Sequence, residues 1–430
     1  MILKGALVWN GNRFVQKDLF VENGVFVEKS HGPSIDVKGY FLVPGFVDSH
    51  AHVVGTGFAK DSISFSSWDE LFEKLNERKQ ENVIFGRGWS EEPDGTTLKK
   101  LDEIEKPIFL IRRCGHKALL NISAMKVLGI KTRYIVENLE PIYEHVFKKE
   151  LLKFYKVGEQ EFLKHGVTFV QSDDLNGVEV EELLDVLKNS RVRLFEKLKY
   201  KNLRPHYFRD LSPKVHVRGI KVFMDGSLGA KTAFISGEYE DGTHGVQLVS
   251  KKKLEKLAEF CDEKSLILNI HAIGDEAVSV TLDVLEKHPG HRIVHAQLIK
   301  EEDLKRLKSA SLTVQPHFYF EDLPLLKNIK VNALLYPFRK IFEMGISISF
   351  SSDSPVSPSD PKYVAEHALK MGFSREETFY LMTEAGARQV KIKTGKIETG
   401  FKADFCLYER NPLLFEDDPA AVFIEGERVL

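Results

Sequence analysis

Two histidines, His50 and His52, stand one residue apart at the end of an apolar run. In a β-strand, residues i and i+2 lie on the same face, so both imidazoles can point to one side and hold one metal ion. A bare His-X-His pair also occurs as ordinary packing or surface histidine. The pair is therefore a candidate metal site that needs further ligands before it carries a function.

Lys221 lies midway along a second apolar run, residues 220–225, where alternation places it on the same face as Asp225. A lysine within a buried strand requires a partner. One interpretation is an ordinary lysine that pairs with Asp225 or reaches the rim of the fold. The other is a lysine that has reacted with carbon dioxide and has become an oxygen ligand. The run by itself favours the ordinary lysine.

Three further apolar runs each carry, near their carboxyl ends, a side chain that can bind a metal, namely His271, His295 and Asp353. Each of the three could singly be a hydrogen-bonded core residue, a helix cap or a turn residue. If the runs are parallel strands of one barrel, their carboxyl ends share one face, which is where barrel enzymes place their catalytic residues. Together with the first two runs they predict a cluster of imidazole and carboxylate ligands.

Apolar runs of strand length alternate with helical patterns at 250–264, 275–287 and 300–309, which is typical of βαβ units and a parallel sheet. Eight runs are candidate strands, the number that a closed barrel needs. They are residues 45–52, 166–172, 192–200, 220–225, 266–271, 292–297, 312–317 and 346–353.

The predicted fold class is α/β: a (β/α)8 TIM barrel with a small β-sandwich module built from both termini and an insertion after strand 1. Short β-like runs broken by turn residues occupy 1–43 and return at 395–430, and these two segments form the predicted module. The barrel is expected over 44–394. Within it, about residues 53–165 are too many for one crossover and indicate the insertion.

Composition excludes several classes of protein. The chain has 430 residues, 43% of them hydrophobic and 29% charged, which can supply both a core and a polar surface. A net charge of -2 gives no reason to expect nucleic acid or an anionic membrane as partner. Three scattered cysteines and the lack of a signal peptide or membrane-length apolar window favour a cytoplasmic protein with no disulfide framework. Expected partners are a small-molecule substrate, no nucleic acid and no membrane, and a homo-oligomer is left open.

The ordered motifs of the chain resemble the amidohydrolase superfamily, and within it the branch that includes N-substituted formamide deformylase and related uncharacterised metal-dependent hydrolases. The resemblance spans nearly the whole chain. It is carried by residues 44–52, 86–89, 115–118, 221–233, 271–275, 295–297, 352–355 and 400–405.

This resemblance implies a role for each candidate ligand. His50 and His52 would bind one divalent ion, His271 and His295 a second, and Lys221, as a carbamate derived from carbon dioxide, would bridge the two. Asp353 would ligate a metal and accept the proton of the attacking water. One or two metal ions are expected, with zinc favoured and iron or manganese as alternatives.

The expected activity is hydrolysis of a carbon–nitrogen bond, in an amide or N-formyl group, by metal-activated water. His295 and Asp353 are the residues expected to be catalytic. Hydrolysis of esters or cyclic amides and deamination of rings remain alternatives on the same metal site. A barrel that binds ligands without catalysis is the alternative from another class, but such a protein should have lost ligands, and all six are present.

Five residues are candidates for substrate binding: Trp89, His116, Asp225, Gln297 and His317. Trp89 and His116 lie in the predicted insertion, where a local aromatic core and a loop are the alternative interpretations. Gln297 and His317 are expected at strand ends, where they could also support the ligands. The chain has cysteine at position 114, where the resemblance leads us to expect an acidic residue, and it is shorter than many relatives. Both departures bear on the substrate rather than on the type of reaction.

Overall fold

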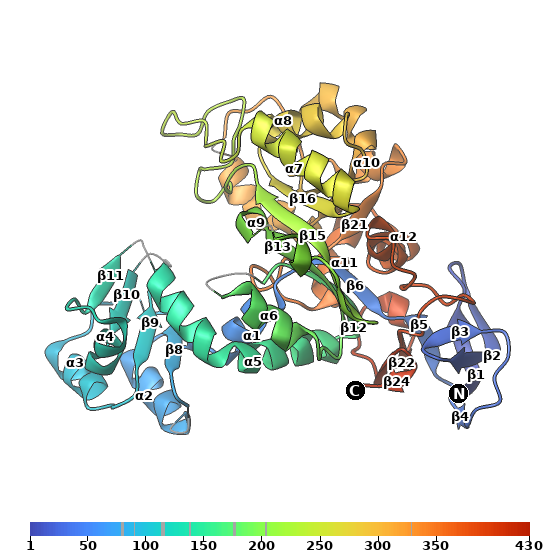
Figure 1. The fold of residues 1–430 in the computed structure, drawn as a ribbon, viewed down its shortest axis with the longest axis horizontal. Coiled ribbons are helices and arrows are strands. Elements are labelled where there is room, and N and C mark those ends of the chain that lie inside the picture. Colours follow the sequence, from blue (N-terminus) through green and yellow to red (C-terminus); the bar gives the residue numbers. More distant parts are fainter. Residues whose placement is uncertain are drawn as a thin grey trace. The chain divides into compact units, whose positions relative to one another are not determined.

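The computed structural model describes residues 1–430 apart from positions 79–80, 90, 113–116, 137–138, 175–177, 203 and 328 (Figure 1). The chain divides into two units. The first consists of Met1–Val53, Glu159–Asp174 and Leu187–Leu430, and the second of Val54–Gly158 and Leu175–Val186. All six predicted ligands belong to the first unit, so this unit alone positions them.

Eight parallel strands form the centre of the first unit, and they follow one another in the sheet in the order of the chain (Figure 1). The predicted (β/α)8 barrel and each of its eight strands are confirmed. The strands are β6 (Phe46–Ala51), β12 (Val167–Ser172), β13 (Arg193–Lys199), β15 (Val215–Phe223), β16 (Ile267–Ala272), β17 (Arg292–His295), β19 (Ser311–Val314) and β21 (Ile348–Phe350). The short β14 (Asp210–Ser212) pairs antiparallel with β15 outside this series.

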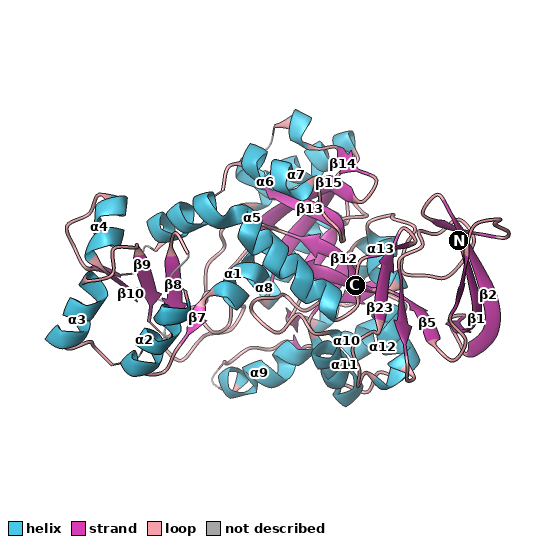
Figure 2. Cartoon of the chain, turned by 90° about the horizontal axis from the view of Figure 1, so that it is seen from below, coloured by secondary structure: helices cyan, strands magenta, loops and turns pink. Residues whose placement is uncertain are grey.

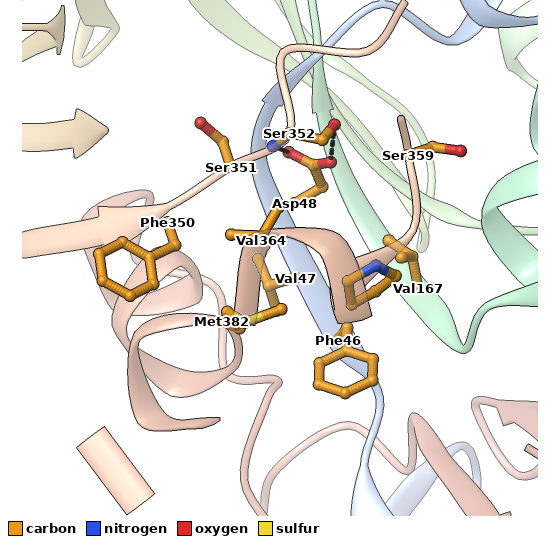
Figure 3. A pocket seen from close by; sticks show the side chains of 11 residues that line it. Phe46, Val47, Asp48, Val167, Phe350, Ser351, Ser352, Ser359, Val364 and Met382 are labelled. Carbon is orange, nitrogen blue, oxygen red and sulfur yellow. Dashed lines mark hydrogen bonds between the residues drawn. The ribbon is translucent and has the colours of Figure 1, made fainter. Parts of the chain in front are cut away.

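The barrel closes between β6 and the chain just beyond β21. The N–H of Asp353 donates to the carbonyl oxygen of His50 at 2.9 Å. Asp48 accepts hydrogen bonds from the N–H and the hydroxyl group of Ser352, at 3.1 Å and 2.5 Å (Figure 3). A pocket next to this closure of the barrel is lined by Val364, among other residues. The closure brings the first and last predicted ligands of the chain next to each other.

The helices between the barrel strands follow the predicted pattern in two of three places (Figure 2). Two predicted helices are observed as α7 (Lys251–Lys264) and α8 (Asp275–Leu285). The helix predicted over 300–309 is wrong, because this segment forms two 3-10 helices, η3 (Glu301–Asp303) and η4 (Arg306–Ser309). Its buried Leu304 and Leu307 are three residues apart, a spacing that a 3-10 helix places on one side.

The remaining helices that touch the first unit are α1 (Val53–Asp61), α5 (Glu140–Lys164), α6 (Val180–Leu187), α9 (Pro316–Leu326), α10 (Phe338–Glu343), α11 (Pro361–Lys370), α12 (Arg375–Leu381) and α13 (Glu384–Gln389). Of these, α1, α5 and α6 have residues in both units. Among the described residues, no helix has both the length and the apolar character needed to cross a bilayer.

Helix α13 packs against the lower part of the barrel. Its Ala387 belongs to a buried cluster with Val47 of β6, Phe169 of β12 and Phe195 of β13. The Gln389 side chain donates to the carbonyl oxygen of Leu312 at 3.0 Å, at the start of β19. Apolar side chains thus fill the barrel near the amino ends of its strands, and the polar groups concentrate near their carboxyl ends.

Strands from both termini form one further sheet, as predicted, in the order β24-β23-β22-β5-β1-β2-β3, with β4 paired to β1 (Figure 1). Its core contains Leu3, Phe26 and Phe405. The strands are β1 (Ile2–Trp9), β2 (Phe14–Glu22), β3 (Val25–Val27), β4 (Ser34–Asp36), β5 (Phe41–Pro44), β22 (Phe405–Tyr408), β23 (Ala421–Ile424) and β24 (Glu427–Arg428). Because β5 ends at Pro44 and β6 begins at Phe46, this sheet anchors the strand that carries the His-X-His pair.

The second unit contains a five-stranded sheet in the order β11-β10-β9-β8-β7. Its strands and helices are β7 (Ile63–Ser64), α2 (Trp68–Glu77), β8 (Ile84–Arg87), α3 (Gly95–Asp102), β9 (Ile108–Ile111), β10 (Lys117–Leu120), α4 (Ile122–Leu128) and β11 (Tyr134–Val136). Trp89 lies in the hydrophobic core of this unit with Phe65 and Leu110, and its indole N–H donates to the Leu110 carbonyl oxygen at 3.2 Å.

Candidate metal centre

The predicted ligands converge near the carboxyl ends of the barrel strands. His50, His295 and Asp353 are buried, and each has a ligand atom within 4.8 Å of those of the other two, a group that could hold a metal ion. Asp353 Oδ1 is 3.3 Å from Nε2 of His50 and 3.4 Å from Nε2 of His52. Three strands of the barrel thus contribute to one cluster, as their shared carboxyl face requires.

Lys221 and His271 extend this cluster. Lys221 Nζ lies 3.2 Å from Nε2 of His50. The ring centroid of His271 is 4.5 Å from that of His295, and His295 is 5.6 Å from His50 by the same measure. The structure therefore brings all six predicted ligands into one continuous group of side chains.

Three of the four histidines donate one ring N–H to an oxygen atom outside the cluster. The bonds run from His52 Nδ1 to the carbonyl of Asp173 (2.6 Å), from His271 Nε2 to the carbonyl of Gly226 (2.8 Å) and from His295 Nδ1 to Oε1 of Gln315 (2.9 Å). Since an oxygen acceptor fixes the proton on the outer nitrogen, the other nitrogen of each ring carries a lone pair. This is the arrangement that surrounds metal-bound histidines in proteins.

His50 has a different outer neighbour. Its Nδ1 lies 2.7 Å from Nζ of Lys197, a buried lysine near the carboxyl end of β13. Burial, with the nearby charge of Lys221, lowers the pKa of Lys197 to about 7. Both nitrogen atoms of the His50 ring therefore face lysine amines, because its Nε2 faces Lys221.

Burial and neighbouring charges favour the protonation states that bind metal. Burial holds the pKa of His50 and His271 well below the usual value and lowers that of His295 to about 4. Burial acts to raise the pKa of Asp353, but its hydrogen bond with His52 and the nearby imidazoles lower the pKa to about 2. The pKa of His52 is raised because that same bond outweighs the effect of burial. Neutral imidazoles and an ionised carboxylate are the forms in which these groups ligate a cation, so His50, His271, His295 and Asp353 favour the ligating form, whereas the raised pKa of His52 favours its protonated form without metal.

The ion pair suggested between Lys221 and Asp225 is wrong. The nearest carboxylate to Lys221 is that of Asp173, with Oδ2 at 3.7 Å from Nζ. Asp225 instead accepts backbone hydrogen bonds from Phe234, Ile273 and Gly274 at 3.0, 3.1 and 2.8 Å. The strand ends at Phe223, so the alternation of a strand no longer sets the direction of the Asp225 side chain. Burial raises the pKa of Asp225 to about 7.

The backbone is strained at two of the candidate ligands. His295 has φ of 82° and Asp353 has φ of 57°, and Ala296 next to His295 has φ of 50°. Residues with a Cβ atom rarely adopt this left-handed region, and such strain clusters at functional sites, where the surrounding structure maintains it. This backbone strain is an observation separate from the side-chain distances, and it points to the same two residues, His295 and Asp353.

The predicted substrate-binding residues lie in several environments. Gln297 follows β17 and is buried, and its Oε1 has no hydrogen-bond partner among the described residues. His317 does not end a strand as predicted, because β19 stops at Val314 and Pro316 begins α9. Proline suits the first turn of a helix, where its missing N–H is not needed. His317 contacts the carbonyl oxygen of Ser352 at 3.2 Å, next to Asp353. Trp89 lies in the core of the second unit, and His116 is outside the described residues.

Sequence analysis missed two residues of the cluster, Lys197 and Asp173. Lys197 lies inside one of the predicted strands. A lysine within a buried strand requires a partner, and this argument, which selected Lys221, would also have selected Lys197. Asp173 directly follows β12, and a carboxylate at the carboxyl end of a barrel strand is the same signal that selected Asp353. Asp173 is 2% exposed, and its Oδ1 has no hydrogen-bond partner among the described residues.

The residues present fit one or more divalent cations. Imidazole nitrogen and carboxylate oxygen are the donor set that zinc, iron and manganese accept. The inner nitrogen of His295 carries a lone pair, because its outer nitrogen donates its proton to Gln315. Two further buried groups, the Lys221 amine and the Asp173 carboxylate, stand beside the histidines. The geometry therefore agrees with a metal centre at this end of the barrel.

Comparison with known proteins points to the same chemistry. Residues 34–430 match the model of the amidohydrolase family. The chain belongs to this family. It is thereby a metal-dependent hydrolase of the amidohydrolase superfamily, and the predicted resemblance is confirmed.

Similar proteins cover the chain almost from end to end. A putative amidohydrolase, YtcJ, from Bacillus subtilis is 28% identical over 94% of this chain and 93% of its own. The N-substituted formamide deformylase of Arthrobacter pascens is 22% identical over 88% of this chain and 85% of its own. The crystal structure of an uncharacterised metal-dependent hydrolase from Pyrococcus furiosus superposes with a TM-score of 0.82 at 26% identity, covering 96% of this chain and 99% of that one.

Proposed function

We propose that this protein hydrolyses a carbon–nitrogen bond in an amide or N-formyl group of a small molecule, with water activated at a centre of one or two divalent metal ions. The observation that carries the proposal is the convergence of His50, His295 and Asp353 within 4.8 Å at the mouth of the barrel. Similarity to N-substituted formamide deformylase supports the choice of bond.

In this proposal His50 and His52 hold one cation and His271 and His295 a second, with zinc as the favoured metal and iron or manganese as alternatives. A bound divalent cation lowers the pKa of water towards about 7 and polarises a carbonyl group. Asp353 takes the proton of the attacking water and returns it to the leaving amine. Its carboxylate is ionised at neutral pH, because the neighbouring imidazoles hold its pKa at about 2 in the buried cluster.

Lys221 is the proposed bridging ligand, as a carbamate. Its neutral amine adds to carbon dioxide, forming an N–C bond and releasing one proton, and the product carries one negative charge on two oxygen atoms. Burial lowers the pKa of Lys221, which favours the neutral amine that this step needs. Without metal, the Asp173 carboxylate at 3.7 Å favours the ammonium form instead, so the carbamate requires the cations to offset two adjacent negative charges.

The direct test is metal analysis of purified protein followed by assays on a panel of N-formyl and N-acyl amines. We expect about one to two equivalents of metal per chain and hydrolysis of members of this panel. Esters, cyclic amides and amino-substituted rings belong in the same panel as alternative substrates. Full activity after complete removal of metal by a chelator would refute the metal-dependent mechanism.

The Lys221 bridge has its own test. Lys221→Ala should lose one of two metal equivalents, and added bicarbonate or a short carboxylate should restore part of it by supplying the missing oxygen ligand. Lys221→Met is the matched control for loss of the amine with the volume kept, and it should leave less space for the added anion. An electron-density map that ends at Nζ of Lys221 with both metal positions filled would rule out the carbamate.

A further inference from the structure

Lys197 occupies a position between two strands next to the proposed metal centre. It is 1% exposed, and its Nζ lies 2.7 Å from Nδ1 of His50 and 2.7 Å from the carbonyl oxygen of Gln171. The backbone pairing of β12 with β13 involves Phe169 and Val170 and ends before Gln171. The lysine side chain therefore connects β13 with β12 beyond the last backbone pair between these two strands, and it also reaches His50 of β6.

The anchor of Lys197 on Gln171 is itself held in place. The Gln171 side chain donates from Nε2 to the carbonyl oxygen of Gly386 at 2.8 Å. Its Oε1 accepts a hydrogen bond from Arg292, which is fully buried and also donates to the carbonyl oxygen of Ser49 at 2.9 Å. Both ends of the Gln171 side-chain amide are thus fixed. The main-chain carbonyl oxygen of the same residue, which accepts from Lys197, therefore has little freedom to move.

His50 has a side chain as the partner of its outer nitrogen, as does His295 with Gln315. His52 and His271 are held by backbone carbonyl oxygens, which no substitution removes. The outer nitrogen of His50 is held by a side-chain amine, which donates to Gln171 and accepts the Nδ1–H hydrogen bond when Nε2 of His50 carries the lone pair for the metal. This contact directs Nε2 of His50 towards Asp353, 3.3 Å away.

We propose that Lys197 is a positioning residue that holds the His50 ring in the orientation needed to bind the metal through Nε2. The inference rests on the proposed metal centre and assigns Lys197 no contact with substrate. Without the amine, the His50 ring can rotate and its Nε2 is no longer directed at the other ligands. The alternative is that Lys197 only joins strands at the end of their ladder, and this would affect stability but not the metal.

The test compares cobalt(II) binding to metal-free full-length protein in the wild type and in Lys197→Met, Lys197→Gln and Leu198→Met. Methionine keeps most of the volume of lysine but cannot accept the Nδ1–H hydrogen bond of His50, and glutamine restores a shorter side chain whose amide oxygen can accept it. Leu198 is a buried neighbour on β13 that serves as the matched control, since leucine and methionine are similar in volume. Titration by the visible absorption of bound cobalt reports both the affinity and the geometry of the ligands, and a thermal melt of each metal-free protein reports folding.

We expect Lys197→Met to bind cobalt about 10- to 100-fold more weakly, with an altered visible spectrum, as is usual when the outer partner of a ligating histidine is lost. Lys197→Gln should recover part of that affinity, and Leu198→Met should match the wild type. Cobalt affinity within about twofold of the wild type in a folded Lys197 variant would overturn the proposal. An equal loss in Leu198→Met would also overturn it. If wild-type protein takes up no cobalt at all, the metal centre itself is refuted, which is a separate outcome.

Discussion

Strand β13 buries two cations, and their surroundings differ sharply. At its amino end, Arg193 is fully buried and forms a two-point ion pair with Asp404, from Nε to Oδ2 at 2.8 Å and from Nη2 to Oδ1 at 3.1 Å. Asp404 also accepts hydrogen bonds from the hydroxyl group of Thr394 at 2.7 Å and from the N–H of Glu425 at 2.9 Å. Four residues further on, Lys197 forms no ion pair with a carboxylate of the described residues and contacts His50 instead.

The two ends of this strand show how one fold uses buried charge for two purposes. A buried charge costs several kcal/mol to desolvate, and only good geometry with further hydrogen bonds offsets this cost. The pair at the amino end meets that condition and joins the barrel to the terminal sheet. The groups at the carboxyl end do not, because Asp173 Oδ1 has no hydrogen-bond partner among the described residues. Their incomplete pairing leaves room for a ligand at the expense of stability.

The largest effect should come from breaking the complete pair. Asp404→Ala leaves the buried Arg193 with Glu425, at 3.2 Å, as its remaining carboxylate partner, and we expect it to lower the free energy of unfolding by about 3 kcal/mol. Cobalt affinity of the folded fraction should be unchanged, since Asp404 is remote from the ligands along β13. Chemical denaturation measures the first and cobalt titration the second, with the exposed Glu427→Ala of the same sheet as control. A loss below about 1 kcal/mol would mean that this end of the strand carries no special stabilisation.

The second largest effect should be on turnover at the candidate metal centre. Asp353→Asn should reduce turnover by about two or more orders of magnitude, equivalent to ~2.7 kcal/mol in the activation barrier, because the group that moves the proton is lost. The free energy of unfolding should not fall as it does in Asp404→Ala. The assay uses the substrate found in the amine panel, and the surface carboxylate Asp417, which pairs with Arg410, supplies the control Asp417→Asn. Nearly normal turnover would require another proton acceptor, with Asp173 as the nearest unassigned carboxylate.

The smallest effect should be a difference in how the free energy of unfolding depends on pH, between the contribution of His295 in the metal centre and that of Asp404. Burial lowers the pKa of His295 to about 4, so below its ordinary pKa of 6.5 the unfolded chain binds more protons there than the folded one, and stability is lost as pH falls. For metal-free protein this amounts to about 1.4 kcal/mol at pH 5.5. His295→Asn, which can keep the bond to Gln315, should remove that part of the pH dependence, as measured by chemical denaturation at pH 7.5 and 5.5.

The raised pKa values of Asp48 and Asp225 increase the stability of the fold as pH falls from 7.5 to 5.5, which is opposite to the effect of His295. The contribution of His295 is therefore obtained by comparing His295→Asn with the wild type. The pKa of Asp404 is also lowered, but from an ordinary value of 3.8, so its contribution is lost only at more acidic pH. Asp404→Asn should therefore retain the wild-type change between pH 7.5 and 5.5. An unchanged pH dependence in His295→Asn would show that His295 is not held neutral by burial.

Much of this molecule could be predicted from local patterns. The eight strands followed from apolar runs of strand length, and the convergence of His50, His271 and Asp353 followed from the shared carboxyl face of parallel strands. The helix over 300–309 could not be predicted correctly, because Leu304 and Leu307 fit the spacing of a 3-10 helix as well as that of an α-helix. His317 was misplaced at a strand end even though Pro316 signals the start of a helix.

The sequence by itself determined the kinds of ligand, their strands and the end of the barrel at which they meet, because these depend on the period-two geometry of strands and on chain order. Only the tertiary structure decided which partner each ligand has. Lys221 faces Asp173 rather than Asp225, and Lys197 reaches His50. These pairs join residues from strands that are distant in sequence, and their contacts depend on strand register and on where each strand ends, which no local pattern specifies.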